Sequence, residues 1–314
     1  MIAITRYTPE SEKEWDDFVR TSKNGTFLLE RSYMDYHHDR FKDHSLIFHD
    51  DKGPVALLPA NEDGDTFCSH QGLTYGGLVM NERVTAAMAC EIFTRLNLYL
   101  KEKHFQQVLY KAIPWIYHQL PAEEDLYALF KVCDARLTAR DVASVIFTQH
   151  PVKWRRDRRF GAKRAAAMGI EVTMSDDYEG FWSVLTGNLQ EKYAVNPVHS
   201  LEEIRLLSRR FPERIRLFVA KMGERLLGGT VLYCCGQTVH AQYISASSEG
   251  KHLHAIDAIF GHLLTEVLTH GEILDFGKST EHMGHLLNET LIYQKEGFGG
   301  RAVCYDWYVW GIKP

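Results

Sequence analysis

The chain has 314 residues, of which 45% are hydrophobic and 25% are charged, and its formal net charge is −5. These values are typical of a soluble globular protein, and the length predicts two domains that each have a core of their own. The negative charge argues against a general nucleic-acid-binding protein, but it is compatible with a local basic patch.

Targeting segments and metal sites are not indicated by the sequence. The N-terminus has no basic start followed by an apolar core, and no window reaches the ~18 apolar residues of a membrane span. Six cysteines without metal or disulfide spacing indicate a reducing compartment. The histidine pairs also lack the partners of a zinc site. We therefore predict a cytoplasmic protein without membrane insertion and without a bound metal ion.

The first half of the chain alternates helical and strand patterns. Its most regular segment is an apolar stripe at every fourth position from Val84 to Leu100, which predicts a long helix. The turn ending at Gly53 joins two apolar strands as a hairpin. In chain order we predict helices over 11–22 and 30–41, strands over 46–49, 55–58 and 66–70, a helix over 82–103, a strand over 108–110 and a helix over 123–133.

A basic stretch leads into the second half, with seven Lys and Arg residues between Lys153 and Arg164. It is interpreted either as a site for phosphate or tRNA or as a solvated helix face. Ser200 and Glu203 have the spacing of a capping box. The elements predicted after the basic helix are helices over 177–186 and 201–210, strands over 215–221, 226–233 and 238–245, a helix over 253–269, a strand over 273–276, a helix over 284–296 and a strand over 302–310.

The second half repeats the plan of the first. A shift of 170 positions aligns identical residues of the two halves: Arg40-Phe41 with Arg210-Phe211, Phe48 with Phe218, Gly53 with Gly223 and Leu57 with Leu227. A helical crossover makes the strands it joins parallel neighbours, whereas hairpins make them antiparallel. We therefore predict an α/β (α+β) fold with two tandem domains, 1–150 and 151–314, each a mixed and mostly antiparallel sheet flanked by helices.

Two stretches of the second half carry a family resemblance. They read AQYISASSEGKHLHAIDAIFGHLL and LDFGKSTEHMGHLLNETLIYQKEGFGG. With the order of elements, they resemble the double-domain, Fem-related acetyltransferase-like proteins, which pair two domains of the GNAT acyltransferase fold. The resemblance implies transfer of an acetyl, other acyl or aminoacyl group to an amine of a small molecule, a sugar or a cell-envelope precursor. It also implies acyl-CoA as co-substrate and no permanently bound cofactor.

The sequence departs from this family pattern at two places. Where the family has a glycine-rich loop that binds pyrophosphate, this chain reads SSEGKHLH from Ser247 and has one glycine. The charged helical arm that Fem enzymes usually carry in the second domain is not found in the sequence. Two alternatives therefore stand beside acyl-CoA-dependent transfer. One is aminoacyl-tRNA-dependent peptidyl transfer of the Fem type, with tRNA as partner. The other is a catalytically inactive binding protein of GNAT shape.

The loop before the helix at 253–269 is the predicted donor site. A helix N-terminus presents unpaired N–H groups and the positive end of the helix dipole, which suit phosphate. An ordinary capped helix start is the alternative. The residues predicted to bind the acyl donor are Ser245, Ser247, Ser248, Gly250 and Lys251.

Polar residues on an inner strand, at the end of a parallel strand and on one helix face are predicted to bind the acceptor. Alternation places His240 and Gln242 on one strand face and Val239, Ala241 and Tyr243 on the other. Tyr75 precedes two glycines that allow close approach of a ligand. Hydrogen bonds within the core are the alternative role. The predicted substrate-binding residues are Tyr75, Gln242, Tyr243, Lys278, Ser279, Asn288 and Lys295.

Three residues are candidates for proton transfer. His199 lies in an irregular segment and has a side chain that can serve as a base near neutral pH. Asp275 lies at the end of a predicted parallel strand. The family resemblance implies that a tyrosine, here Tyr293, protonates a leaving thiolate. A capping or loop role for His199, a structural acceptor role for Asp275 and simple packing for Tyr293 are the alternatives.

Overall fold

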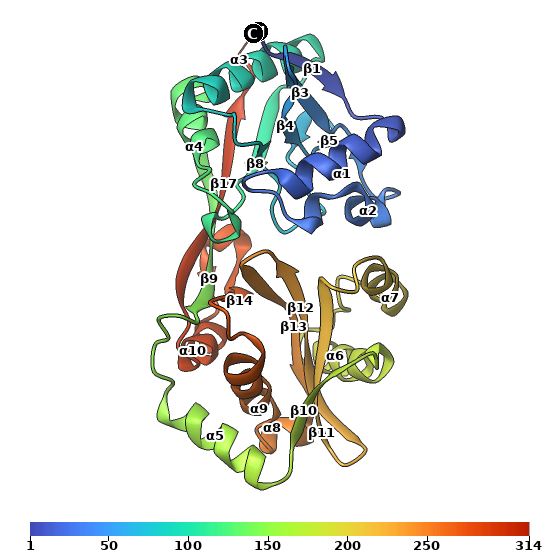
Figure 1. The fold of residues 1–314 in the computed structure, drawn as a ribbon, viewed down its shortest axis with the longest axis vertical. Coiled ribbons are helices and arrows are strands. Elements are labelled where there is room, and N and C mark those ends of the chain that lie inside the picture. The colour runs from blue at the N-terminus through green and yellow to red at the C-terminus, as the bar shows by residue number, and fades with distance from the viewer. Residues whose placement is uncertain (314) are drawn as a thin grey trace. The chain divides into compact units, whose positions relative to one another are not determined.

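The computed structural model describes residues 1–313. The chain divides into two compact units, which are described one at a time (Figure 1). The N-terminal unit comprises Met1–Asp141, Thr280–Leu286 and Cys304–Pro314, and the C-terminal unit comprises Val142–Ser279 and Leu287–Val303. Two long strands, β9 (Arg136–Phe147) and β17 (Arg301–Gly311), therefore contribute residues to both units.

The N-terminal unit contains two sheets. Their strand orders are β1-β3-β4-β7 and β17-β8-β6-β5-β2, and the β6–β8 pair is parallel. The elements are β1 (Ala3–Arg6), α1 (Glu12–Thr21), α2 (Arg31–Met34), β2 (Lys42–Asp43), β3 (Leu46–Asp50), β4 (Gly53–Leu58), β5 (Asn61–Asp63), β6 (Thr66–Cys68), β7 (Val79–Met80), α3 (Ala86–Glu102), β8 (Gln107–Lys111) and α4 (Glu124–Ala128). The short strands β15 (Thr280–Glu281) and β16 (Leu286–Leu287) pair with each other.

The predicted long helix of this unit is confirmed as α3. Its stripe residues Ile92, Leu96 and Leu100 are fully buried in the main hydrophobic cluster with strand residues such as Phe48. Burial of one apolar face of this kind supplies most of the stability of a helix in a protein.

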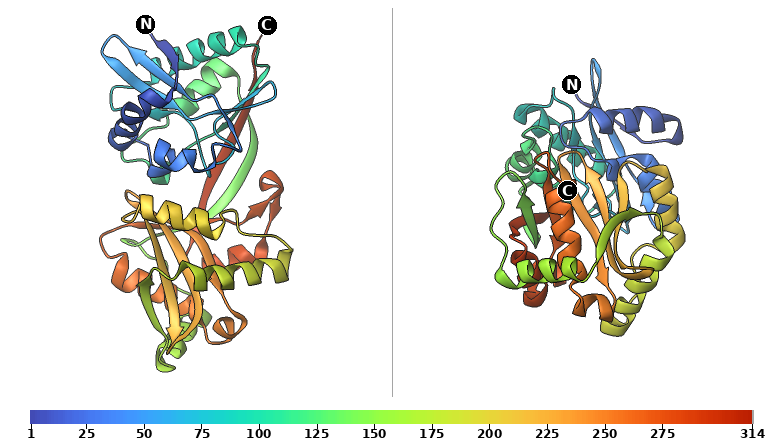
Figure 2. Two further views of the ribbon diagram at one scale, coloured as in Figure 1. Left: turned by 90° about the vertical axis from the view of Figure 1, so that its right-hand side faces the viewer. Right: turned by 60° about the horizontal axis from the view of Figure 1, so that its bottom comes forward.

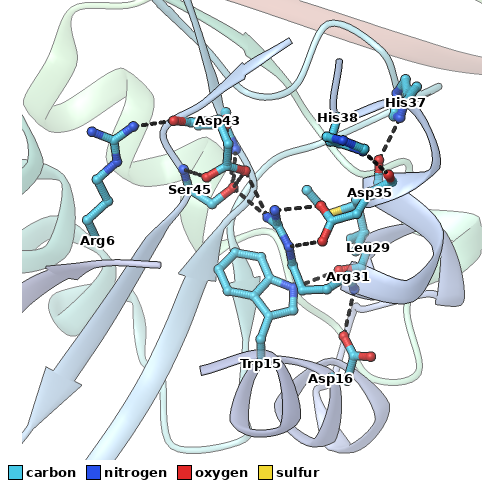
Figure 3. Close-up of polar contacts among 12 residues, drawn as sticks. Arg6, Trp15, Asp16, Leu29, Arg31, Asp35, His37, His38, Asp43 and Ser45 are labelled. Carbon is cyan, nitrogen blue, oxygen red and sulfur yellow. Dashed lines mark hydrogen bonds and ion pairs between the residues drawn. The ribbon is translucent and has the colours of Figure 1, made fainter. Parts of the chain in front are cut away.

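A buried arginine organises the polar interior of the N-terminal unit (Figure 3). The Arg31 guanidinium donates to Asp35 at 2.7 Å, to Asp43 at 2.9 Å and to Ser45 at 3.1 Å. Its central carbon lies 3.8 Å from the centre of the Tyr7 ring. The predicted helix over 30–41 is reduced to α2 and a short 3-10 turn, and the His37 ring there contacts the Met34 carbonyl.

The C-terminal unit contains one mixed sheet of strand order β10-β11-β12-β13-β14-β9, in which only the β13–β14 pair is parallel among the described residues. Its other elements are α5 (Arg156–Ala167), β10 (Glu171–Ser175), α6 (Tyr178–Tyr193), α7 (Leu201–Arg210), β11 (Ile215–Met222), β12 (Arg225–Cys235), β13 (Thr238–Ala246), α8 (Ser248–His252), α9 (Ala255–His262), β14 (Ile273–Lys278) and α10 (Glu289–Gly297).

Helices cover both faces of this sheet. Figures 1 and 2 show α6 and α7 on one face and α9, with α5 packed against it, on the other. The α9 face holds the main hydrophobic cluster of the unit, which includes Phe260, Leu263, Leu274 and Phe276. The prediction of an α/β fold with mixed sheets flanked by helices is thus confirmed.

The helix predicted over 253–269 is found as α9 and the π-helical turn Leu263–Val267 that continues it. The left-handed backbone of His254 (φ 61°) separates α9 from the short helix α8 before it. The regular alternation predicted along β13 is wrong. Ala241 pairs with Leu232 and Tyr243 with Val231, so Gln242 is the extra residue of a β-bulge. The bulge places Tyr243 on the α6 face, where its ring contacts Trp182.

Candidate functional site

The candidate site lies where the parallel β13–β14 ladder ends. The two strands pair at Thr238↔Ile273, Val239↔Leu274 and His240↔Asp275. After these three pairs, β13 continues along β12 as far as Ala246, and β14 continues along β9 as far as Lys278. Ligands of open α/β sheets bind outside the carboxyl ends of the strands, so polar residues at this point are candidates for chemistry.

His240 and Asp275 form a hydrogen-bonded pair at the last rung of this ladder. Nδ1 of His240 lies 2.8 Å from Oδ2 of Asp275, which is fully buried, while the His240 side chain keeps 12% of its surface exposed. The other carboxylate oxygen accepts the Gly277 N–H at 2.8 Å. An ionised Asp275 keeps the proton on Nδ1, so Nε2 carries the lone pair that could accept a proton.

Gly277 is required for this arrangement. Its φ of +69° lies in the left-handed region, and a Cβ built on it would lie 2.9 Å from Cε1 of His240. A side chain at this position would therefore be strained and would push the imidazole away from its place.

Lys295 of α10 brings a buried positive charge to the same strand end. Its Nζ donates to the carbonyl oxygens of Gly277 at 2.9 Å and Lys278 at 2.7 Å. Burial lowers the pKa of Lys295 to about 8, and the nearby Asp275 carboxylate opposes this shift. Three predicted residues thus lie at this strand end: Asp275 bonds to His240, and Lys295 bonds to the main-chain carbonyl of Lys278.

The β-bulge lies two residues beyond His240. A bulge takes backbone groups of its extra residue, here Gln242, out of the regular ladder. Backbone N–H groups that point toward the oxygen of a reacting carbonyl stabilise its negative charge. The bulged residue thus lies on the strand that also carries the histidine.

His199 and Tyr243 form a second polar pair, on the α6 face. The Tyr243 hydroxyl accepts the main-chain N–H of His199 at 3.2 Å and lies 2.5 Å from Nδ1 of its ring. Trp182 donates its indole N–H to the His199 carbonyl at 3.2 Å. Burial raises the pKa of Tyr243 to about 12, and only 4% of the His199 surface is exposed. This pair is packed into the unit.

The residues predicted to bind the donor gather around Asn188 of α6. Its amide nitrogen donates to Oγ of Ser245 and to the Ala246 carbonyl, both at 2.6 Å, and its Oδ1 accepts from Lys251 at 2.5 Å. Oγ of Ser247 caps α8 by accepting the Gly250 N–H at 3.0 Å. Ser248 is exposed. Asn188 was not predicted as a site residue, because its contacts with Ser245 and Lys251 span more than 50 positions.

Gly250 allows α8 to approach β12. A Cβ at this position would lie 2.0 Å from the Leu227 carbonyl oxygen. Any other residue would therefore displace this helix from the strand.

Each of the remaining predicted residues has structural contacts of its own. Tyr75 belongs to the N-terminal unit, where its hydroxyl lies 2.9 Å from Oγ1 of Thr26. Asn288 caps α10 by accepting the Leu291 N–H at 3.0 Å. Ser279 is buried and its N–H donates to the Val142 carbonyl. Tyr293 is 61% exposed, and the Arg155 guanidinium lies 3.5 Å from its ring centre.

Within residues 1–313, no three His, Cys, Asp or Glu side chains lie close enough together to hold a metal ion. In the same part of the chain, no helix combines the length and the apolar surface that crossing a bilayer requires.

Comparison with known proteins gives a match over the segment that carries His240 and Asp275. Residues 152–283 match the acetyltransferase (GNAT) domain family. The solved structure of FemX is similar over 97% of this chain and 96% of its own, with a TM-score of 0.67 at 11% sequence identity. L-PGS from Bacillus licheniformis is similar over 98% and 93%, with a TM-score of 0.63 at 13% identity.

A third structure, a tandem GNAT protein from the clavulanic acid biosynthesis pathway, covers 100% of this chain and 99% of its own, with a TM-score of 0.51 at 11% identity. Comparison with curated protein sequences gives no match. At these identities the structures establish a shared fold, which is the fold that the sequence predicted.

Proposed function

We propose that this protein is an acyltransferase that moves an acyl group to an amine at the end of the β13–β14 ladder, and the match of residues 152–283 to the acetyltransferase (GNAT) domain family supports this. The location is inferred from the His240–Asp275 pair, in which Nδ1 and Oδ2 lie 2.8 Å apart at the last rung of this ladder. A histidine oriented by a buried carboxylate has the geometry of a general base.

In the proposed reaction the amine nitrogen attacks the carbonyl carbon of the acyl donor. The new C–N bond forms as the bond to the leaving group breaks, and the amine proton passes to Nε2 of His240. Asp275 stabilises the resulting imidazolium through Nδ1. Backbone donors at the Gln242 bulge would hold the carbonyl oxygen while it carries negative charge.

Acyl-CoA is the proposed donor. The segment from Ser245 to Lys251, which includes Ser247, Ser248 and Gly250, joins the end of β13 to α8 and is held to α6 through Asn188. Its hydroxyls, backbone amides and ammonium group suit a phosphate. When the donor is a thioester, the leaving thiolate takes up a proton, and Tyr293 is the candidate for supplying it.

The acceptor is proposed to lie beside the strand ends. Gln242, Lys278, Ser279 and Asn288 are the candidates that would contact it. Tyr243 is proposed to hold strand β13 in place beside the acceptor through its bonds with His199. The proposed acceptor class is a small molecule, sugar or cell-envelope precursor with a free amine.

A specific observation favours a second donor, an aminoacyl-tRNA. Helix α5 presents several basic side chains on its exposed surface, among them Arg156 and Arg164. Such a surface would bind an RNA backbone with an affinity that falls steeply as salt increases. Tyr75, in the other unit, has no proposed contact with either donor.

The test is a calorimetric titration with acetyl-CoA, longer acyl-CoAs and charged tRNA, followed by turnover with the donor that binds. We expect His240→Ala to lower kcat by about 10²–10⁴-fold, because it removes the base, and to leave the donor Kd unchanged. His270→Ala is the matched control, because His270 is an exposed histidine of the same unit. Wild-type kcat in His240→Ala would rule out the proposed base. Failure of every donor to bind at millimolar concentration would favour an inactive binding protein.

A further inference from the structure

A cavity of about 470 Å³ between α5 and α9 lies outside the candidate site. Its lining comes from the end of β9, the segment after it, α5 and α9. It lies near the start of β14, since Thr148 in its lining donates through N–H and Oγ1 to the Glu272 carbonyl. His240 and Asp275 line no part of it, so this α5–α9 cavity is a second feature of the C-terminal unit.

The floor of the α5–α9 cavity is apolar. Ile146, Trp154 and Leu264 line it, and Val152 at its edge is 38% exposed. The Trp154 ring is held in place by an edge contact with Phe298, with ring centres 5.0 Å apart. An apolar floor that stays accessible is typical of a site for the apolar part of a ligand.

Three cations surround this floor. Lys153, Arg159 and Lys163 line the cavity and are exposed. Among the described residues none of the three donates to a carboxylate, whereas two other arginines of the same stretch do: Arg155 binds Asp157, and Arg158 binds Asp257. Like charges gathered around a low-dielectric surface repel each other and create a positive potential that attracts an anion.

The walls of the cavity are preformed. The segment that carries Val152 to Trp154 is tied at one end by Thr148 and at the other by Arg155, whose N–H donates to the Gly297 carbonyl at 2.9 Å. Nη1 of Arg155 donates to the Tyr293 carbonyl, also at 2.9 Å. A wall fixed before binding needs no ordering when a ligand enters, which favours affinity.

A glycine on α9 leaves part of the cavity open. A Cβ at Gly261 would lie 3.7 Å from Cβ of Ala162 and 4.0 Å from Cη2 of Trp154, which are ordinary contacts. A methyl group would therefore fit at this position, and a larger side chain would project into the space lined by Trp154.

We propose that the α5–α9 cavity binds a small amphiphilic anion, a carboxylate or phosphate carried on an alkyl or aryl chain. The apolar chain would lie against Trp154 and Leu264, and the anionic group would be held by Lys153, Arg159 and Lys163. The cavity volume is in the range of small-molecule sites. This site is separate from the proposed acyl transfer, and its test needs no turnover.

The test is calorimetry on the full chain with ligands that share a decyl chain, each below its micelle-forming concentration. Decanoate and decyl phosphate are expected to bind, with an affinity that falls as salt increases. Decyl maltoside and decyltrimethylammonium are expected not to bind, and acetate and inorganic phosphate are expected to bind at least tenfold more weakly. The bound decyl chain is expected to change tryptophan fluorescence in the wild type and not in Trp154→Phe.

Two pairs of variants separate the cavity from its surroundings. Arg159→Gln/Lys163→Gln is expected to weaken the binding of decanoate and decyl phosphate at least tenfold. Arg156→Gln/Arg164→Gln removes the same charge from α5 outside the cavity, and its affinity for both ligands is expected to stay within twofold of the wild type. Gly261→Leu is expected to abolish binding, and Gly261→Ala to retain it. Melting temperatures of all variants show whether each one is folded.

Four results would overturn the proposal. If the two double charge variants lose the same affinity for decanoate, the basic residues form a general surface for anions. The same conclusion would follow if inorganic phosphate bound as tightly as decyl phosphate. Equal binding of decyl maltoside would remove the role of the cations. Unchanged decanoate binding by folded Gly261→Leu would place the ligand elsewhere.

Discussion

The two units share a parallel strand pair and differ in the groups that bridge the strands where the pairing ends. In the N-terminal unit β6 and β8 pair at three positions, ending at Cys68↔Leu109. The chain itself then bridges the strands, because Ser69 donates its N–H to the Leu109 carbonyl and its Oγ accepts the Lys111 N–H at 2.7 Å. In the C-terminal unit β13 and β14 also pair at three positions, but the bridge there is the side-chain pair His240–Asp275.

The polar side chains of the two units show a related contrast, although the buried lysines Lys111 and Lys295 both donate to main-chain carbonyls. In the N-terminal unit Arg31 lies between Asp35 and Asp43, and Lys111 donates to the carbonyls of His70, Gln71 and Leu73. These contacts neutralise or solvate the charge with the unit's own groups. In the C-terminal unit the histidine keeps a partly exposed ring beside a buried carboxylate. A similar strand pair thus supports structure in one unit and presents a candidate base in the other, since function depends on the site and not on the fold.

The largest effect that would test this contrast is expected for Arg31→Met. Removing the guanidinium leaves the Asp35 and Asp43 carboxylates without their partner, which we expect to lower the free energy of unfolding by about 3–5 kcal/mol. Urea denaturation measures this loss. If the charges of the N-terminal unit serve structure alone, the kcat of the folded fraction stays at the wild-type value.

Two further variants isolate the cause of that loss. Arg31→Met/Asp35→Asn/Asp43→Asn removes the uncompensated charges and is expected to recover most of the stability. Arg20→Met removes a half-exposed arginine bound to Glu30 and is expected to cost no more than about 1 kcal/mol. A kcat that falls in folded Arg31→Met would break the contrast between the units.

The second test uses the buried lysine of the C-terminal unit. The pKa of Lys295 is about 8, below its ordinary value of 10.5, so between these pH values the unfolded chain binds a proton that the folded chain does not. The free energy of unfolding then rises with pH by ~1.4 kcal/mol per unit across this window, because the cost of burying the charge disappears. Lys295→Met is expected to lack this rise.

The measurement is the difference between wild-type and Lys295→Met unfolding free energies from pH 7 to 10.5. Lys251→Met serves as the control, because it removes an exposed lysine of the same unit. Curves for the wild type and Lys295→Met that stay parallel throughout would show that Lys295 has the same pKa in the folded and the unfolded chain, so that burial does not disfavour its charge.

Patterns confined to neighbouring residues predicted the fold well. The stripe from Val84 to Leu100 gave α3, and Ser200 with Glu203 forms the expected capping box at α7. By contrast β9 was not predicted, because its first half is polar and one of its contacts is the pairing of Arg140 with the distant Asp306. An interaction across more than 160 positions leaves no local pattern.

The site was predicted only in part, for the same reason. Asp275 was identified from its place at the end of a predicted parallel strand and Lys295 from its place on one helix face, whereas His240 was noted only as a polar residue on an inner strand. Its partner lies 35 positions away, and only the ladder register brings the two together. The bulge at Gln242 depends on pairing with β12, so strict alternation assigned Tyr243 to the wrong face.

The smallest test compares one helix cap in each unit. Ser200 forms two bonds at α7, accepting the Glu203 N–H at 3.1 Å and donating its own N–H to that carboxylate at 2.8 Å, whereas Thr85 at α3 accepts only the Met88 N–H at 3.3 Å. We expect Ser200→Ala to cost about 1 kcal/mol and Thr85→Ala about 0.5 kcal/mol. If the units unfold as separate cooperative bodies, hydrogen exchange will show each loss only in the unit that carries the variant. Equal losses in both units would mean that the chain unfolds as one body, so that the contrast between the units concerns their chemistry and not their stability.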